Sequence, residues 1–154
     1  MKRTAVGLAA VAALGVAVLI PAVGQSQAPR TITLDARTTG VKVVDLPPRG
    51  KSSAGDLLMS TSSLRNAEGA RVGTGHLSCN LTGRARTFES ANYECTGTHK
   101  LRDGTITFAG DVRLASREIT VAVTGGTGAY DGASGQLVNT STSDTVSKQV
   151  ITLK

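Results

Sequence analysis

Short segments in which polar and apolar residues alternate fill the chain from residue 30 to residue 153, and this pattern constrains the fold most. A period of two places one set of side chains on each face of a β-strand. After residue 24, no window of about 11 residues carries the 3.6-residue repeat of an amphipathic helix. We therefore predict an all-β protein with strands at 30–38, 41–46, 56–64, 71–81, 90–101, 105–112, 117–124, 134–142 and 145–153.

Turn residues separate these segments. Asp103-Gly104 stands between two alternating runs, which is typical of a tight hairpin. Residues 124–135 read TGGTGAYDGASG, in which positive φ costs little at Gly125, Gly126, Gly128, Gly132 and Gly135.

A phosphate-binding loop is the alternative for this glycine segment. A Walker A loop needs a terminal Gly-Lys-Ser/Thr and a following helix, and neither feature follows here. We interpret the segment as a structural turn. About eight short antiparallel strands predict a sandwich or an up-and-down barrel, and an eight-stranded barrel has room for one small ligand.

The first 24 residues resemble a signal peptide. Met1-Lys2-Arg3 is basic, residues 5–20 are apolar apart from two glycines, and small residues follow at Ala22 and Gly24. The apolar stretch is short for a membrane span, which needs about 20 residues, although an uncleaved anchor is the alternative. We expect a secreted protein with no stable membrane span after cleavage.

The expected domain organisation follows from this leader. Cleavage after Gly24 removes 24 of the 154 residues and leaves 130, enough for one domain with its own core. We expect a signal peptide at 1–24, N-terminal strands and a flexible loop at 25–55, and the β-barrel core at 56–154.

The basic charge of the chain does not indicate a nucleic-acid partner. The net charge is +6, and it falls to about +4 without Lys2 and Arg3. The remaining basic residues are scattered along the sequence, and the chain has no Trp, two Phe and two Tyr. Nucleic-acid binders cluster basic residues on one face and often add stacking aromatic side chains. We therefore expect no nucleic-acid partner.

Cys79 and Cys95 are the two cysteines of the chain. In a hairpin that turns near Thr87, facing residues have numbers that sum to about 174, a condition that this pair meets. Export favours a disulfide, which would close a loop of about 15 residues and contribute about 3 kcal/mol. A reactive free thiol is the alternative.

The two histidines do not form a metal site in the same hairpin. His76 and His99 would lie nearly opposite each other in this hairpin. However, His76 is an odd number of residues from Cys79, whereas His99 is an even number of residues from Cys95. Because side chains alternate along a strand, the two imidazoles should lie on opposite faces of the sheet. We expect no bound metal and no cofactor.

Three stretches resemble the allene oxide cyclase and dirigent barrel superfamily. They are GDLLMSTSSLRNAEGARVGTGHLSC at 55–79, NYECTGTHKLRDGTITFAGD at 92–111 and AVTGGTGAYDGASGQ at 122–136. The resemblance covers about the last 100 residues and implies an eight-stranded antiparallel barrel with an apolar cavity. Plant members cyclise a fatty-acid epoxide or steer the coupling of phenolic radicals, and bacterial relatives include polyketide cyclases. Relatives form dimers or trimers, so the resemblance also implies a homo-oligomer.

The family's functional residues carry over in part. An asparagine that holds a water in the cyclase corresponds to Ser62, the cyclase cysteine to Cys79, and a cavity tyrosine falls near Val112. The nearest candidate for the glutamate of the cyclase's first strand is Asp35, whose alternation with apolar residues suggests exposure. The dirigent A-R-G sequence is replaced by residues 133–135, Ala-Ser-Gly. We assign no catalytic residue.

Serines and two charged residues are ligand-pocket candidates. If Leu58 and Leu64 mark the core face, Ser60 and Ser62 line the lumen. Asp111 and Arg113 end one strand, where Arg117-Glu118 begin the next. This charged quartet would bind a ligand at a barrel mouth, or form ordinary solvated hairpin pairs.

Tyr130 is the last pocket candidate. It matches the aromatic position of both groups of the superfamily, and its alternative role is packing beneath the glycine turn.

Three functional classes remain open. The first is a secreted barrel that binds or guides a small hydrophobic molecule in a cavity lined mainly by aliphatic side chains. The second is a cyclase or isomerase of a lipid or polyketide-type substrate, which acts through cavity shape and a held water. The third is a structural or protein-interaction barrel with a filled interior. A cavity separates the first two from the third.

Overall fold

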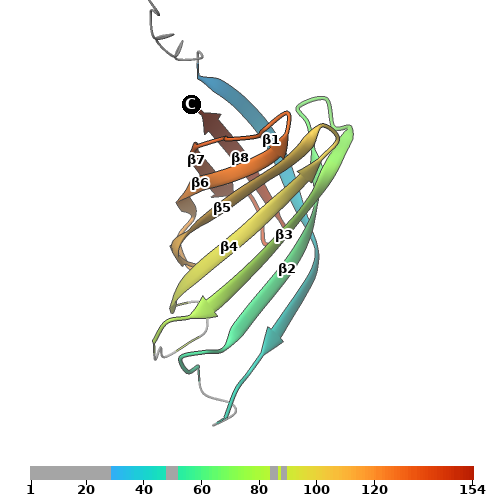
Figure 1. Ribbon diagram of the computed structural model, residues 1–154. Coiled ribbons are helices and arrows are strands. Elements are labelled where there is room, and N and C mark those ends of the chain that lie inside the picture. The colour runs from blue at the N-terminus through green and yellow to red at the C-terminus, as the bar shows by residue number, and fades with distance from the viewer. Residues whose placement is uncertain (1–28, 48–51, 84–86, 88–89) are drawn as a thin grey trace, which may run out of the picture.

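The described part of the chain contains eight β-strands joined by turns and loops. The computed structural model describes residues 29–47, 52–83, 87 and 90–154, so the leader predicted at 1–24 lies outside the described residues. The strands, shown in Figure 1, are β1 (Arg30–Val44), β2 (Leu57–Arg65), β3 (Arg71–Leu81), β4 (Asn92–Leu101), β5 (Gly104–Arg113), β6 (Glu118–Gly128), β7 (Gly135–Ser141) and β8 (Val146–Leu153).

The eight strands close into one antiparallel barrel in chain order. Each strand pairs with the next, and β1 pairs with β8 from Arg30 opposite Leu153 to Arg37 opposite Val146. The strands cross the barrel obliquely (Figure 1). This confirms the predicted up-and-down barrel. In the described ranges there is no helix long and apolar enough to cross a bilayer.

The first strand is longer than the alternation predicted. The two expected strands at 30–38 and 41–46 are one strand, β1, with a register shift against β2 between Thr38 and Gly40. The shift admits one extra residue, Thr39, whose hydroxyl donates to the backbone oxygen of Thr61 at 3.2 Å. A β-bulge of this kind interrupts the polar–apolar alternation without ending the strand. The prediction of two strands was therefore wrong.

The glycine segment divides into a strand end and a turn. Gly125 and Gly126 belong to β6, whereas Gly128, Gly132 and Gly135 have φ values of +64°, +68° and +145°. Only these last three therefore require the conformational freedom expected for all five. Gly126 is needed for space instead, because a Cβ there would lie 2.6 Å from the backbone oxygen of Thr105.

Two hairpin predictions are confirmed. Leu101 pairs with Gly104, so Arg102 and Asp103 form the tip of the β4–β5 hairpin. In the β3–β4 hairpin Cys79 faces Cys95, and the two form a disulfide with their Cα atoms 4.0 Å apart.

A buried carboxylate holds the connection between β1 and β2. Asp56 is 2% exposed and accepts backbone N–H bonds from Ser53 and Leu46, each at 2.9 Å. These two donors hold the pKa of Asp56 below its ordinary value of 3.8. Asp56 thereby links Leu46 and Ser53 to the start of β2, the strand that carries the predicted lumen serines.

One end of the lumen is solid. The start of β1 and β5 and the end of β2 and β8 meet there, because neighbouring strands run in opposite directions. Their inward side chains are aliphatic and nearly inaccessible, and we call them the packed end: Leu34, Leu64, Ile106, Ile151 and Leu153. These residues supply much of the burial that stabilises the barrel.

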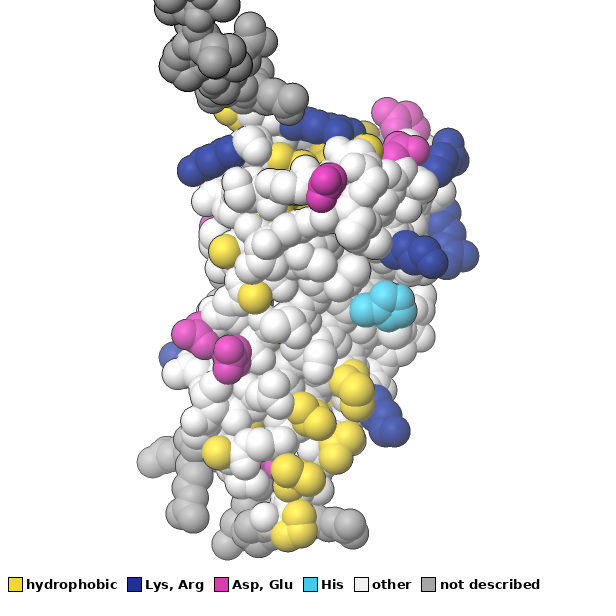
Figure 2. Space-filling model, in the orientation of Figure 1, with side chains coloured by type: hydrophobic (Ala, Val, Ile, Leu, Met, Phe, Trp, Pro, Cys, Tyr) yellow, Lys and Arg dark blue, Asp and Glu magenta, His cyan; other side chains and the backbone are white. Residues whose placement is uncertain are grey.

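The outer surface differs between the two ends. Figure 2 shows Lys and Arg side chains toward the upper part of the molecule and hydrophobic side chains gathered near its lower end. Val41, Val43 and Leu46 are exposed by 60%, 48% and 40%. Val41 and Val43 lie where β1 continues past Val146, the first residue of β8, and pairs with β2 alone, and Leu46 follows the end of β1.

Candidate ligand-binding cavity

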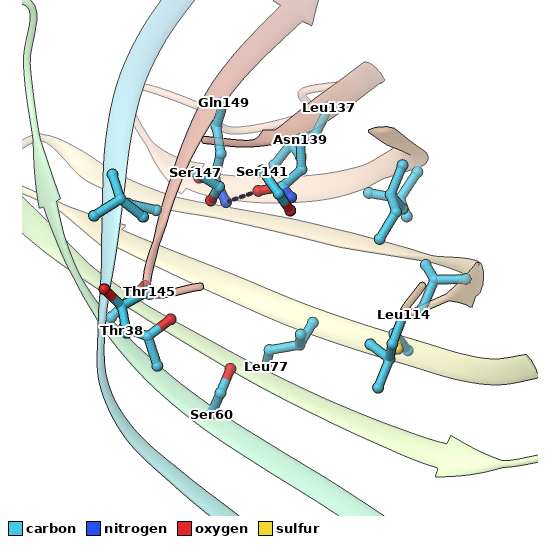
Figure 3. Close-up of a pocket in the computed structure, with 18 of the residues that line it drawn as sticks. Thr38, Ser60, Leu77, Leu114, Leu137, Asn139, Ser141, Thr145, Ser147 and Gln149 are labelled. Carbon is cyan, nitrogen blue, oxygen red and sulfur yellow. Dashed lines mark hydrogen bonds between the residues drawn. The ribbon is translucent and has the colours of Figure 1, made fainter. Parts of the chain in front are cut away.

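A cavity of about 240 Å³ occupies the lumen beyond the packed end. It is bordered by the β7–β8 hairpin at Ser143–Thr145 and by Leu114 after β5. The hairpin residues are exposed, so the cavity opens beside them. Figure 3 shows side chains from both sides of the barrel pointing into this space. The lumen therefore contains an open space next to the packed end.

The cavity has two chemically different walls. Strands β7, β8, β1 and β2 contribute mainly hydroxyl and amide side chains, and we call these the polar wall: Thr38, Ser60, Ser62, Asn139, Ser141, Ser147 and Gln149. Strands β3 to β6 and the residue after β5 contribute the apolar wall: Leu77, Phe108, Val112, Leu114, Ile119 and Val121. The expected lining of mainly aliphatic side chains is therefore correct for one half of the cavity only.

The alternation of side chains along β2 directs two serines of the polar wall into the lumen. Leu64 is fully buried, and Ser62 and Ser60 lie two and four residues before it on the same face of β2. Both serines line the cavity, in the position that the sequence predicted for them. Their role toward a ligand stays a prediction.

A hydrogen-bonded chain of three side chains crosses from β4 to β7. His99 Nε2 lies 2.8 Å from Gln149 Oε1, and Gln149 Nε2 donates to Asn139 Oδ1 at 3.0 Å. His99 and Gln149 are only 2% and 8% exposed. Because the Gln149 oxygen can only accept, His99 Nε2 carries the proton and Nδ1 is left with a lone pair.

His99 is a neutral imidazole held in an apolar setting. Burial lowers its pKa below the ordinary value of 6.5, and the hydrogen bond to Gln149, together with a smaller contribution from the Thr98 backbone, opposes that change only in part. The Phe108 ring packs against the imidazole edge to face, with the ring centroids 4.8 Å apart. Among the described residues, His99 Nδ1 has no hydrogen-bond partner.

Two glycines make room for this arrangement. A Cβ at Gly97 would collide with the Phe108 ring, and a Cβ at Gly75 would lie 3.1 Å from His99 Nδ1. The same Cβ at Gly75 would also overlap the Ser62 hydroxyl. The space above Gly75 is thus shared by the Ser62 hydroxyl and the unpaired nitrogen of His99.

The charged pocket candidates lie outside the cavity lining. Asp111 and Arg113 are exposed, and neither lines the cavity. Val112 between them points inward and lines the cavity, so its two neighbours must point outward. Arg117 and Glu118 are also exposed. All four side chains therefore lie on the solvent-exposed surface of the barrel, and their role toward a ligand stays a prediction.

Tyr130 packs beneath the glycine turn. It is 6% exposed and does not line the cavity, and the Arg30 guanidinium lies 5.1 Å from the centroid of its ring. The packing role weighed for Tyr130 is the one that the structure supports.

The remaining residues of interest have clear positions. His76 is exposed and His99 buried, so the two lie on opposite faces as predicted. Within the described ranges no group of three His, Cys, Asp or Glu side chains comes together as a metal site. Asp35 is exposed, as its alternation suggested.

Gln149 and Asn139 were not predicted as site residues. A signal for them exists in the sequence, because Gln149 shares its face with Ile151, and Asn139 shares its face with Leu137. A polar residue on the otherwise apolar face of a strand is unusual, and this pattern could have identified both residues as site candidates.

The chain matches one protein family and is similar to several solved structures. Residues 31–153 match the family described as "Allene oxide cyclase barrel like domain". Among solved structures, a pyocyanin demethylase superposes with a TM-score of 0.71 at 26% identity, covering 81% of this chain and 100% of that one. None of the curated proteins matches the chain.

Two further solved structures are similar in fold. The Diels–Alderase AbmU from Streptomyces koyangensis has a TM-score of 0.64 at 14% identity, covering 82% of this chain and 63% of that one. A pterocarpan synthase dirigent protein has a TM-score of 0.61 at 16% identity, covering 82% of this chain and 88% of that one.

Proposed function

Since this chain belongs to the allene oxide cyclase barrel-like family, we propose that it binds a small, uncharged, largely apolar molecule in its lumen. The cavity of about 240 Å³ carries this proposal. Pockets for small molecules combine apolar walls with a few polar groups that fix orientation, and the two walls described above have this composition. The empty volume argues against the class of barrels with a filled interior.

The charge of the lining supports an uncharged ligand. Asp144, in the exposed β7–β8 hairpin, is the one carboxylate among the described residues that line the cavity, and no Lys or Arg is among them. A charged ligand would lose its hydration without gaining an opposite charge inside the lumen.

The similar structures support a small organic ligand. The name of the pyocyanin demethylase gives pyocyanin as the molecule that it acts on, and its whole length aligns with this barrel. The Diels–Alderase and the dirigent protein share the fold.

Export is part of the proposal. The basic and apolar segment at 1–24 is the proposed leader, and the remainder is a barrel domain that functions outside the cytoplasm. The disulfide between Cys79 and Cys95 is compatible with an oxidising compartment. The homo-oligomer implied by the resemblance stays a prediction.

A cyclase is the second candidate function. The observation that favours it is the rigid, strand-built enclosure of the cavity, because a confined substrate can be folded into a reactive shape without a nucleophile. Formation of a cyclised product by the protein would distinguish this candidate from simple binding.

A cavity-filling variant tests the proposal. 1-Methoxynaphthalene, an uncharged apolar probe, is titrated into the protein, and bound small molecules are sought by native mass spectrometry. We expect wild-type protein to bind the probe and Ser60→Phe, which fills the lumen, to weaken binding at least about tenfold. Ser78→Phe is the matched control, because Ser78 is exposed on the neighbouring strand. Equal binding of the probe to Ser60→Phe would overturn the proposal, and so would failure of wild-type protein to bind either this probe or its hydroxyl analogue, 1-naphthol.

A further inference from the structure

His99 Nδ1 is the least explained polar atom in the described structure. It belongs to a side chain that is 2% exposed, lines the cavity and has no hydrogen-bond partner for this nitrogen. Buried polar atoms in folded proteins nearly always have a partner, and the exceptions call for an explanation. A partner that is a ligand would provide one.

The other end of the imidazole fixes what that partner must be. Asn139 accepts from Gln149 Nε2, and this directs Gln149 Oε1 toward His99 Nε2. His99 therefore donates through Nε2 and can only accept through Nδ1 while it is neutral. A ligand hydroxyl or N–H satisfies Nδ1, whereas an ether or carbonyl oxygen places a lone pair against it.

Space for such a donor exists next to Nδ1. A Cβ on Gly75 would stand 3.1 Å from Nδ1 and would overlap the Ser62 hydroxyl, so the missing side chain leaves both groups open to the lumen. Ser62 can accept or donate, and it offers a second hydrogen bond to the same ligand atom. The polar wall and the apolar wall meet at this point, because Ser62 belongs to the first and Phe108 packs on His99 from the second.

From these contacts we infer that the lumen selects uncharged molecules with an apolar body and a hydroxyl or N–H group, which donates to His99 Nδ1. This inference rests on the proposed function and names the ligand class for the same cavity. Phenols and enols are the simplest members of the class. A site built to receive a hydrogen bond rejects an analogue that lacks the donor, because its own polar atom is then left unpaired.

Two probes that differ in one donor test this inference. 1-Naphthol carries the hydroxyl, and 1-methoxynaphthalene replaces its proton by a methyl group. We expect wild-type protein to bind 1-naphthol about tenfold more tightly, which corresponds to about 1.4 kcal/mol. In His99→Leu this preference should vanish while 1-methoxynaphthalene still binds. Ser62→Ala should reduce the preference only in part.

A measurement on wild-type protein avoids dependence on the folding of His99→Leu. The ¹⁵N resonance of Nδ1 reports whether that nitrogen accepts a hydrogen bond. We expect this resonance to move when 1-naphthol is added and to stay in place with 1-methoxynaphthalene. The Nε2 resonance should change less with either probe.

The outcomes separate this inference from the proposed function. Equal affinity for the two probes, or an Nδ1 resonance unchanged by 1-naphthol, would overturn the role of His99 and leave cavity binding intact. Failure of both probes to bind would overturn the proposed function and the assignment of His99 with it.

Discussion

The packed end and the cavity are built from the same eight strands, yet they have opposite properties. At the packed end the inward positions are Leu or Ile, and Leu64, Ile106 and Ile151 are fully buried. Along the polar wall the inward positions are mostly Ser, Thr and Asn. The backbone therefore determines which way a side chain points, and side-chain volume determines whether the lumen is solid or hollow.

The difference also concerns what holds each region together. The packed end relies on close contact between aliphatic side chains, which stabilises in proportion to the area removed from water. The disulfide from Cys79 to Cys95 lies on the cavity side of the barrel, with Cys95 in the lining and the buried side chains of Leu81 and Tyr93 on the same two strands. A covalent link therefore adds to side-chain packing on this side of the barrel, whereas the packed end relies on packing without such a link.

Truncation of a leucine in each region tests this comparison most strongly. Leu64→Ala should lower the free energy of unfolding by about 4 kcal/mol, because it opens a void among fully buried neighbours. Leu77→Ala, on the apolar wall, should cost about 1 kcal/mol, since Leu77 already borders empty space. Urea unfolding measures both. Equal losses would show that the two regions are packed alike.

Removal of the disulfide should have the next largest effect. The double variant Cys79→Ala/Cys95→Ala should lose about 3 kcal/mol, because the unfolded chain regains the entropy of a loop with a sequence separation of 16 residues. Hydrogen exchange should increase in β3 and β4 beside the cavity before it increases at the packed end. An increase spread evenly over all strands would contradict the proposed local role.

A methyl group at Gly97 should have a smaller effect. Gly97→Ala should cost about 2 kcal/mol, because the new Cβ meets the Phe108 ring and displaces it from His99. Gly125→Ala is the control, since its Cβ would meet the Thr107 hydroxyl at an ordinary 3.4 Å. Thermal unfolding compares the two variants, and similar melting temperatures would show that Phe108 moves at little cost.

The pH dependence of stability should show the smallest effect. The folded-state pKa of His99 is lowered from 6.5, so its contribution is fully present above pH 6.5 and is lost as the pH falls toward the folded-state pKa. His99→Leu should abolish this decline. Asp56→Asn should leave this decline intact. It should lower stability at all pH values above 3.8, because it removes the carboxylate that accepts two backbone N–H bonds, and it should abolish the further loss of stability as the pH falls from 3.8 toward the lower folded-state pKa of Asp56. Urea unfolding at a series of pH values measures both windows, and an unchanged slope in His99→Leu would contradict the prediction.

The sequence predicted what depends on alternation. The pairing of β3 with β4, and of Cys79 with Cys95 within it, follows from counting residues on either side of the hairpin turn. The inward direction of Ser60 and Ser62 follows from their distance to Leu64. These are local properties, because the period of a strand is fixed by its backbone geometry.

The parts that were missed depend on three dimensions. The contact between His99 and Gln149 joins residues 50 positions apart, on strands that are not neighbours in the sheet. It forms across the lumen, so pairing rules between adjacent strands do not reveal it. The bulge at Thr39 was missed because one inserted residue changes the face of everything that follows it.

Closure between β1 and β8 has a consequence for the chain as a whole. Arg30 sits beside Leu153, so the two ends of the barrel are neighbours. In a closed barrel whose eight strands pair in chain order, any strand could be the first one in the sequence. A circular permutant could join Lys154 to Arg30 by a short linker and begin and end at the Arg102–Asp103 hairpin tip. It would keep all strand pairings of the barrel, so the fold does not depend on the order in which the strands are synthesised.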